Sequence, residues 1–205
     1  MKKTSPKYPV FVVLALCLAM TSAFAESPIP PTDSPVIITS CGQSPGATMI
    51  KVIFMKMKLP EGSYEEKGLV TADDLKAKAD SGSPYKTLII TMGASLKGMG
   101  AAGVSMEEEL ARTAQLIDEA RRQGMTVIGA HVEGIKRRAQ GADPGDNTDE
   151  MSIDAVAPNS DLLIVRHEGN ADGRFTTIAE EKGLPMIEVE KTLDLVPEFE
   201  KLFKK

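Results

Sequence analysis

Tryptophan is absent from this chain of 205 residues, aromatic residues make up 4% of it, and cysteine and histidine occur only twice each. Acidic residues outnumber basic ones by 29 to 24, so the formal net charge is −5 at pH 7. An acidic chain without tryptophan and without a basic run is poorly suited to the phosphate backbone of nucleic acids, and we expect no nucleic-acid partner.

The first 25 residues have the three parts of a cleavable secretory signal. Lys2, Lys3 and Lys7 supply positive charge, Val10 to Met20 is a continuous apolar run, and residues 23–25 (AFA) supply the small residues of a cleavage site. No later apolar stretch is long enough to span a bilayer as a helix. We therefore expect a periplasmic or secreted protein, cleaved after about residue 25, with no membrane span after cleavage.

Short β-branched runs alternate with amphipathic stretches in the rest of the chain. The runs at 36–39, 87–91, 126–129, 162–165 and 186–189 mostly lack polar alternation, which is typical of parallel strands buried on both faces. Helical patterns separate them, and one begins at the capping box Ser105–Glu108 and ends near Gly124. Alternating strands and helices predict βαβ units. We expect an α/β fold of three layers, doubly wound and Rossmann-like or flavodoxin-like, with about five mainly parallel strands.

The chain shows no internal repeat, and after the expected signal it divides into a leader and one domain. Residues 26–34 (ESPIPPTDS) predict an extended leader, and residues 35–205 predict a single α/β domain. Further helices are expected at 71–79, 176–182 and 194–203, with a short strand near Leu69. Residues 143–150 are rich in acids and predict a solvated loop without the spacing of a calcium-binding EF-hand.

In a doubly wound fold, ligands bind beyond the carboxyl ends of the strands. The loop after the first strand spans residues 40–47, where Ser44 is expected to cap a helix with Pro45 at its first position. The free amides at such a helix start favour an anion. This loop predicts ligand contacts by Gly42, Gln43, Ser44 and Gly46, and its alternative interpretation is a tight turn that begins a helix.

Signal cleavage would remove Cys17 and leave Cys41 as the one cysteine, so no internal disulfide is expected. Cys41 follows the first strand, near the expected helix start, where a thiol's pKa is lowered and the reactive thiolate is favoured. This position makes it a candidate nucleophile. Its alternative interpretation is a small buried hydrophobic residue.

Polar side chains also follow the other strands, in a glycine-rich loop at 93–103 and in two loops that each carry a histidine. If these loops converge, their thiol, imidazole and carboxylate groups would suit a transition metal, but the absence of HExxH and CxxC spacing favours hydrogen bonding to a small polar ligand instead. No metal ligand is assigned, and no cofactor is indicated. The candidate contacts are Lys97, His131, Glu133, Arg166, His167, Glu168, Asn170 and Arg174.

The segments TSCGQSPGA at 39–47, GAHVEG at 129–134 and RHEGN at 166–170 resemble a family of exported bacterial proteins, catalogued as a domain of unknown function with the number 6305. The resemblance extends from about residue 36 to residue 203. It implies a bacterial, extracytoplasmic domain without an assigned activity, and it transfers no catalytic residues.

Three functions fit these patterns. The first is a binding domain that holds a small anionic molecule, through a carboxylate or phosphate group, at the carboxyl edge of the sheet, with a transporter or sensor protein as its partner. The alternative is a cysteine- or metal-dependent hydrolase or transferase, in which Cys41 acts as the nucleophile with His131 or His167 as the base. The third is a structural or protein-interaction domain.

Overall fold

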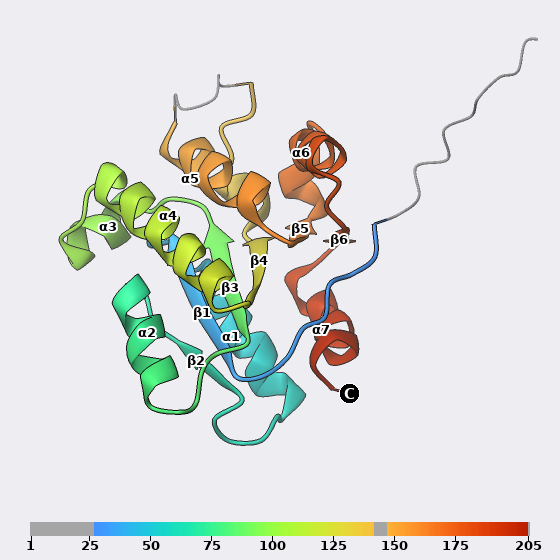
Figure 1. The fold of residues 1–205 in the computed structure, drawn as a ribbon. Coiled ribbons are helices and arrows are strands. Elements are labelled where there is room, and N and C mark those ends of the chain that lie inside the picture. Colours follow the sequence, from blue (N-terminus) through green and yellow to red (C-terminus); the bar gives the residue numbers. More distant parts are fainter. Residues whose placement is uncertain (1–26, 142–146, 205) are drawn as a thin grey trace, which may run out of the picture.

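The computed structural model describes residues 27–141 and 147–204, which fold around one sheet with helices on both sides (Figure 1). The predicted secretory signal and residues 143–146 of the predicted solvated loop lie outside the described residues. The end of that predicted loop is wrong, because residues 148–150 begin a helix and Glu150 is fully buried.

Six strands form the sheet in the order β2-β1-β3-β4-β5-β6, and every neighbouring pair is parallel. The order 2-1-3-4-5 is that of flavodoxin-like doubly wound folds, and β6 extends it by one strand. The predicted α/β class is therefore confirmed, in its flavodoxin-like form. The strands are β1 Val36–Cys41, β2 Tyr64–Glu66, β3 Thr87–Met92, β4 Thr126–His131, β5 Leu162–Arg166 and β6 Met186–Val189.

The five expected apolar runs all form strands, and the sixth strand, β2, is displaced from the short strand expected near Leu69. It spans Tyr64–Glu66 rather than the surroundings of Leu69, none of its three residues is buried, and it pairs with β1 alone. An edge strand of this length carries no apolar run. Hydrophobic periodicity therefore does not detect it.

The described residues form seven α-helices, of which α1 to α6 lie between strands and α7 follows the last strand, and several of their boundaries follow local capping. Ser105 Oγ accepts a hydrogen bond from Glu108 N at 3.2 Å, and Glu108 Oε2 accepts one from Ser105 N at 2.7 Å, so the predicted capping box begins α4. Gly124 follows the helix with a φ of 70°. The helices are α1 Gly46–Met57, α2 Ala72–Asp80, α3 Leu96–Ala102, α4 Met106–Arg122, α5 Thr148–Val156, α6 Arg174–Lys182 and α7 Leu195–Phe203.

The sheet separates two hydrophobic cores, which makes the three predicted layers. On one face, α1 and α7 pack through residues such as Phe54 and Phe199, whose ring centroids lie 5.3 Å apart. On the other face, α2, α4, α5 and α6 contribute residues such as Leu116, Ile153 and Phe175. Both faces of the central strands are therefore covered, as their uninterrupted apolar sequences require.

The residues before β1 run along the amino ends of the strands. Thr126 Oγ1 donates to Pro31 O at 2.6 Å, Asp33 N donates to Thr87 Oγ1 at 3.2 Å, and Thr32 Oγ1 donates to Leu202 O at 2.8 Å. This extended segment therefore connects β3 and β4 to α7 at the edge of the sheet opposite the predicted site.

Candidate functional site

The loops after β1 and β3 bond to each other at the carboxyl edge, where the chain order reverses and a ligand crevice is expected. Gln43 and Ala94 form an isolated antiparallel bridge, and Ser95 N donates to Gly42 O at 2.7 Å. These contacts close the crevice between β1 and β3. A ligand that approaches this edge meets the loops themselves.

Glycine makes this closure sterically feasible. A β-carbon on Gly42 would lie 2.7 Å from Ala94 Cα, and one on Gly98 would lie 2.2 Å from Gln43 O. Gly42 also has a φ of 98°, a conformation that side chains disfavour. The predicted role of Gly42 in approaching a ligand therefore gives way to a role in packing one loop against another.

A buried ion pair on α4 fixes the loop that follows β1. Glu109 is fully buried and accepts hydrogen bonds from Gly42 N at 2.8 Å and Gln43 Nε2 at 2.9 Å. Arg112 pairs with Glu109 at 2.9 Å and donates to Ser40 O at 2.6 Å. Burial opposes ionisation of Glu109, but the bonds and charge of Arg112 outweigh it, so the pKa of this carboxyl lies below its ordinary value.

Cys41 lies inside the core and not at the surface of the site. Its side chain is fully buried, in the same cluster as Met92 and Leu116. Burial raises the pKa of the thiol to about 11, and the nearby Thr113 and Arg112 offset only part of this effect. The expected low thiol pKa is therefore wrong, because desolvation exceeds the influence of the nearby helix start.

The register of the sheet separates Cys41 from His131. Cys41 pairs with Met92 on β3, and His131 follows the residue of β4 that pairs with Thr91. One strand therefore lies between the two residues, and two strand spacings put their backbones roughly 10 Å apart. The structure does not bring the predicted nucleophile and this predicted base together.

His131 has a structural environment. It is fully buried, its ring centroid lies 5.0 Å from that of Phe175, and its Nε2 lies 3.0 Å from Arg137 O. Burial lowers the pKa of this imidazole. A β-carbon on Gly169 would lie 2.5 Å from His131 Nδ1, so the glycine after β5 accommodates the ring.

His167, the second predicted base, lies further from Cys41 still. It follows β5, which β3 and β4 separate from β1. It is exposed, and its Nδ1 lies 2.5 Å from Glu188 Oε1 on the neighbouring strand. That hydrogen bond raises the pKa of His167.

The predicted arginine contacts are engaged by carboxylates within the protein. Arg174 pairs with Glu150 at 3.2 Å and also with Asp154, and Arg166 pairs with Glu168 at 3.0 Å. Arg174 therefore neutralises the buried Glu150, and Arg166 pairs with the exposed Glu168, both at the edge formed by β4, β5 and β6.

A fully buried arginine, Arg138, lies at the centre of the part of the carboxyl edge that β4, β5 and β6 form. It pairs with Glu150 at 2.8 Å and with Asp172 at 2.6 Å. Burial opposes ionisation of Asp172, but the hydrogen bond from Arg138 prevails and lowers the pKa of that carboxyl. Asn170 lies in the same loop as Asp172. Its Oδ1 accepts a hydrogen bond from Phe175 N at 2.9 Å and stabilises the start of α6.

The start of α1 differs from its prediction. Its N-cap position is Pro45, whose φ of −67° and ψ of 0° are already helical, and no side chain caps the helix. Ser44 therefore lies one position too early to act as the cap. Its Oγ is buried and has no hydrogen-bond partner among the described residues. Glu133 Oε1 lies 3.3 Å from the place of a β-carbon on Gly46, so an internal carboxylate already faces this helix start.

One pocket at the carboxyl edge contains predicted contacts. It has a volume of about 430 Å³ and lies beside β1, between the end of β2 and α3. Gln43 and Ser44 line it from the β1 loop, Glu66 lines it from β2, and Lys97 and Gly98 line it from α3. This volume lies within the range of small-molecule sites, about 300–1,000 Å³.

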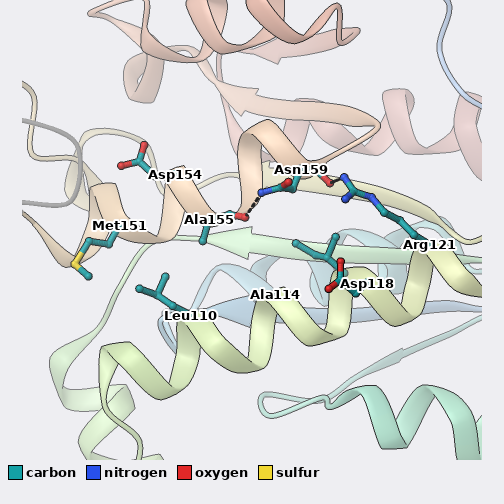
Figure 2. Close-up of a pocket in the computed structure, with 9 residues that line it drawn as sticks. Leu110, Ala114, Asp118, Arg121, Met151, Asp154, Ala155 and Asn159 are labelled. Carbon is teal, nitrogen blue, oxygen red and sulfur yellow. Dashed lines mark hydrogen bonds between the residues drawn. The ribbon is translucent and has the colours of Figure 1, made fainter.

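A larger and more apolar groove of about 460 Å³ lies between α4 and α5, away from every predicted contact (Figure 2). Leu110 and Ala114 line it from α4, and Met151 and Ala155 face them from α5. Its exposed lining is mostly apolar, although Asp118, Arg121 and Asp154 border it, and Asn159 Nδ2 is already bonded to Ala155 O at 3.0 Å. We therefore assign the candidate site to the smaller, more polar pocket.

The structure thus distributes the predicted residues over three places and does not gather them. Gln43, Ser44 and Lys97 line the pocket, Cys41 and His131 are in the core, and the other predicted polar residues belong to the networks after β4 and β5. Glu66, Glu109 and Arg112 were not predicted. Glu109 and Arg112 lie beside a capping box, and Glu66 lies in a short edge strand. Polar residues at such positions give no indication of a binding site in the sequence.

Two further properties concern the part of the chain that the structure describes. Within residues 27–141 and 147–204, no group of three or more histidine, cysteine, aspartate or glutamate side chains is arranged to hold a metal ion. None of the helices described there combines the length and apolar character needed to cross a membrane.

The fold and the closed crevice define a flavodoxin-like, doubly wound α/β domain with a polar pocket beside β1. Residues 33–203 match the family described as "Domain of unknown function (DUF6305)", and the chain belongs to this family. The predicted resemblance is therefore confirmed. No curated protein matches the sequence.

Solved structures with partial likeness include two esterases. The psychrotrophic esterase EstA from Pseudoalteromonas sp., in a structure inhibited by monoethylphosphonate, is 10% identical with a TM-score of 0.34, and the alignment covers 78% of each chain. An acetyl xylan esterase, AlAXEase, is 11% identical with a TM-score of 0.36, and the alignment covers 81% of this chain and 83% of the other. Likenesses at this level carry no argument about activity.

Proposed function

We propose that this domain binds a small molecule with a carboxylate or phosphate group in the pocket beside β1 and β2, and that it does so outside the cytoplasm. The observation that carries the proposal is the position of Lys97. This lysine lines the pocket, and it forms no ion pair with any described carboxylate. Arg138, Arg166 and Arg174 at the same edge are each held by acids.

The remaining lining supports a polar ligand. Ser44 offers a hydroxyl group with no partner among the described residues, and Gln43 is held rigidly below the pocket by Glu109. A buried polar group without a partner is costly unless something binds it. A ligand oxygen would satisfy the Ser44 hydroxyl while its negative charge meets Lys97. The secretory-signal pattern supports the location, with a transporter or sensor as the protein partner.

Calorimetric titration of the purified domain with inorganic phosphate, propionate and valerate tests the proposal. We expect at least one of these anions to bind, and Lys97→Ala to weaken its binding about tenfold, the loss of roughly 1.4 kcal/mol for one charged hydrogen bond. Lys136→Ala is the matched control, because Lys136 is exposed at the same edge but does not line the pocket.

Two outcomes would reject the proposal. The first is that no ligand with a phosphate or carboxylate group, these three anions included, binds the unaltered domain at millimolar concentration. The second is that the Lys97 and Lys136 variants bind equally well.

A further inference from the structure

The pocket has two walls of opposite charge. Lys97 lies on the wall formed by α3, together with Gly98 and Ala101, and Glu66 lies on the wall formed by the end of β2, together with Gly68. The positive wall and the negative wall thus come from elements 30 residues apart in sequence, on either side of the β1 loop.

These two charges do not neutralise each other. No described carboxylate lies within 4.0 Å of Lys97 Nζ, so a gap separates it from Glu66. The ion pair that Glu66 does form, with Lys51, is long at 3.4 Å, and the side chains of Lys51 and Glu66 are 44% and 19% exposed. A long pair with a half-exposed lysine is weak, so a cationic group in the pocket can compete with Lys51 for Glu66. The Glu66 carboxylate therefore retains the capacity to bind a cation from the pocket.

The floor between the walls is rigid and polar. Gln43 holds a left-handed backbone conformation with a φ of 54°, and its Nε2 donates to Gly68 O at 3.1 Å as well as to Glu109. These bonds join the β1 loop to the β2 wall. The separation of the walls is therefore set before a ligand arrives, which reduces the entropic cost of binding.

We infer that the pocket takes a small zwitterion, with its anionic group at Lys97 and a protonated amine at Glu66. The inference rests on the proposed function and narrows it. A simple anion would be attracted by Lys97 but repelled by Glu66, whereas a zwitterion satisfies both walls at once. Ser44 and Gln43 line the same pocket and add polar groups to the lining between which such a ligand would bind.

Two matched ligand sets test the inference by calorimetry: alanine, lactate and propionate, and the longer norvaline, 2-hydroxyvalerate and valerate. Within each set the carbon skeleton is constant, and an amine is replaced by a hydroxyl group and then by hydrogen. We expect the amino acid of at least one set to bind about tenfold more tightly than its two analogues. Glu66→Gln should abolish this preference, while Lys97→Gln should weaken all three ligands of the set.

Glu61→Gln is the control, because Glu61 is exposed before β2 and does not line the pocket. If the three members of one set bind with equal affinity and the other set shows no preference for the amine either, the inference is overturned and the proposed function remains intact. Retention of the preference in Glu66→Gln would also overturn it. If phosphate and every carboxylate fail to bind the unaltered domain, the proposed function itself fails.

Discussion

The two halves of the carboxyl edge treat positive charge differently. After β4 and β5, Arg138, Arg166 and Arg174 are half-buried or buried, and each pairs with at least one carboxylate of the chain. Beside β1 and β2, Lys97 is exposed and has no ion pair with a described residue. The comparison shows that the number of cations at an edge says little about anion binding. What matters is whether internal acids already hold them.

Replacement of Arg138 by alanine should cause the largest loss of stability among the variants that test this comparison. The change leaves Glu150 buried and deprives it of its closest cation, and removal of one partner from a buried pair costs about 3–5 kcal/mol. For a domain of this size the melting temperature should fall by roughly 10 °C. Thermal unfolding followed by circular dichroism measures the shift, with the exposed Arg121→Ala as the control. A loss of stability as small as the control's would mean that the arginine-rich half is not a structural network.

Glu109→Gln should have an intermediate effect, of about 2 kcal/mol, because an amide cannot replace the charged acceptor that holds Gly42, Gln43 and Arg112. The pKa of Glu109 is lowered in the folded protein, so its stabilising contribution is present above the carboxyl's ordinary pKa and is lost as the pH falls through the lowered value.

Urea unfolding at several pH values measures this dependence. The difference in unfolding free energy between the original protein and Glu109→Gln should be greatest near neutral pH and should shrink in acid. The exposed Glu107→Gln provides a control of the same chemistry on the same helix. A difference that stays constant down to strongly acidic pH would contradict the argument that the ionised carboxylate holds the loops.

Lys97→Ala should have the smallest effect on stability, within about 0.5 kcal/mol, because an exposed lysine without a described ion pair contributes little to folding. The same variant is expected to lose ligand affinity, so stability and binding are separated at this residue. Chemical denaturation of the ligand-free variant provides the measurement. A loss of 2 kcal/mol or more would place Lys97 among the structural cations and remove the contrast between the two halves.

Sequence patterns predicted the layers because these depend on local regularities. The apolar runs at β1, β3, β4 and β5 and the capping box at Ser105 each identify an element without knowledge of its neighbours. β2 was misplaced because three half-exposed edge residues contain no such regularity.

The site was harder to predict because it depends on long-range pairing. The glycine at position 42 was predicted to contact a ligand, yet it packs against Ala94, and the acid that fixes its backbone is Glu109, 67 residues away. Likewise, Cys41 and His131 both come at strand ends, but the register inserts β3 between them. A position relative to a strand end gives the edge on which a residue lies. It does not give the residue's neighbours along that edge.

The extended segment before β1 has a practical consequence for experiments on this domain. Its residues Pro31–Asp33 and the end of α7 at Leu202 meet at the amino edge, whereas the pocket opens at the opposite one. An affinity tag, fluorophore or surface linkage attached near either of these two places would therefore leave the entrance of the pocket unobstructed. Immobilised protein should therefore give the same result as the free domain in the proposed binding experiments, whichever of the two attachments is chosen.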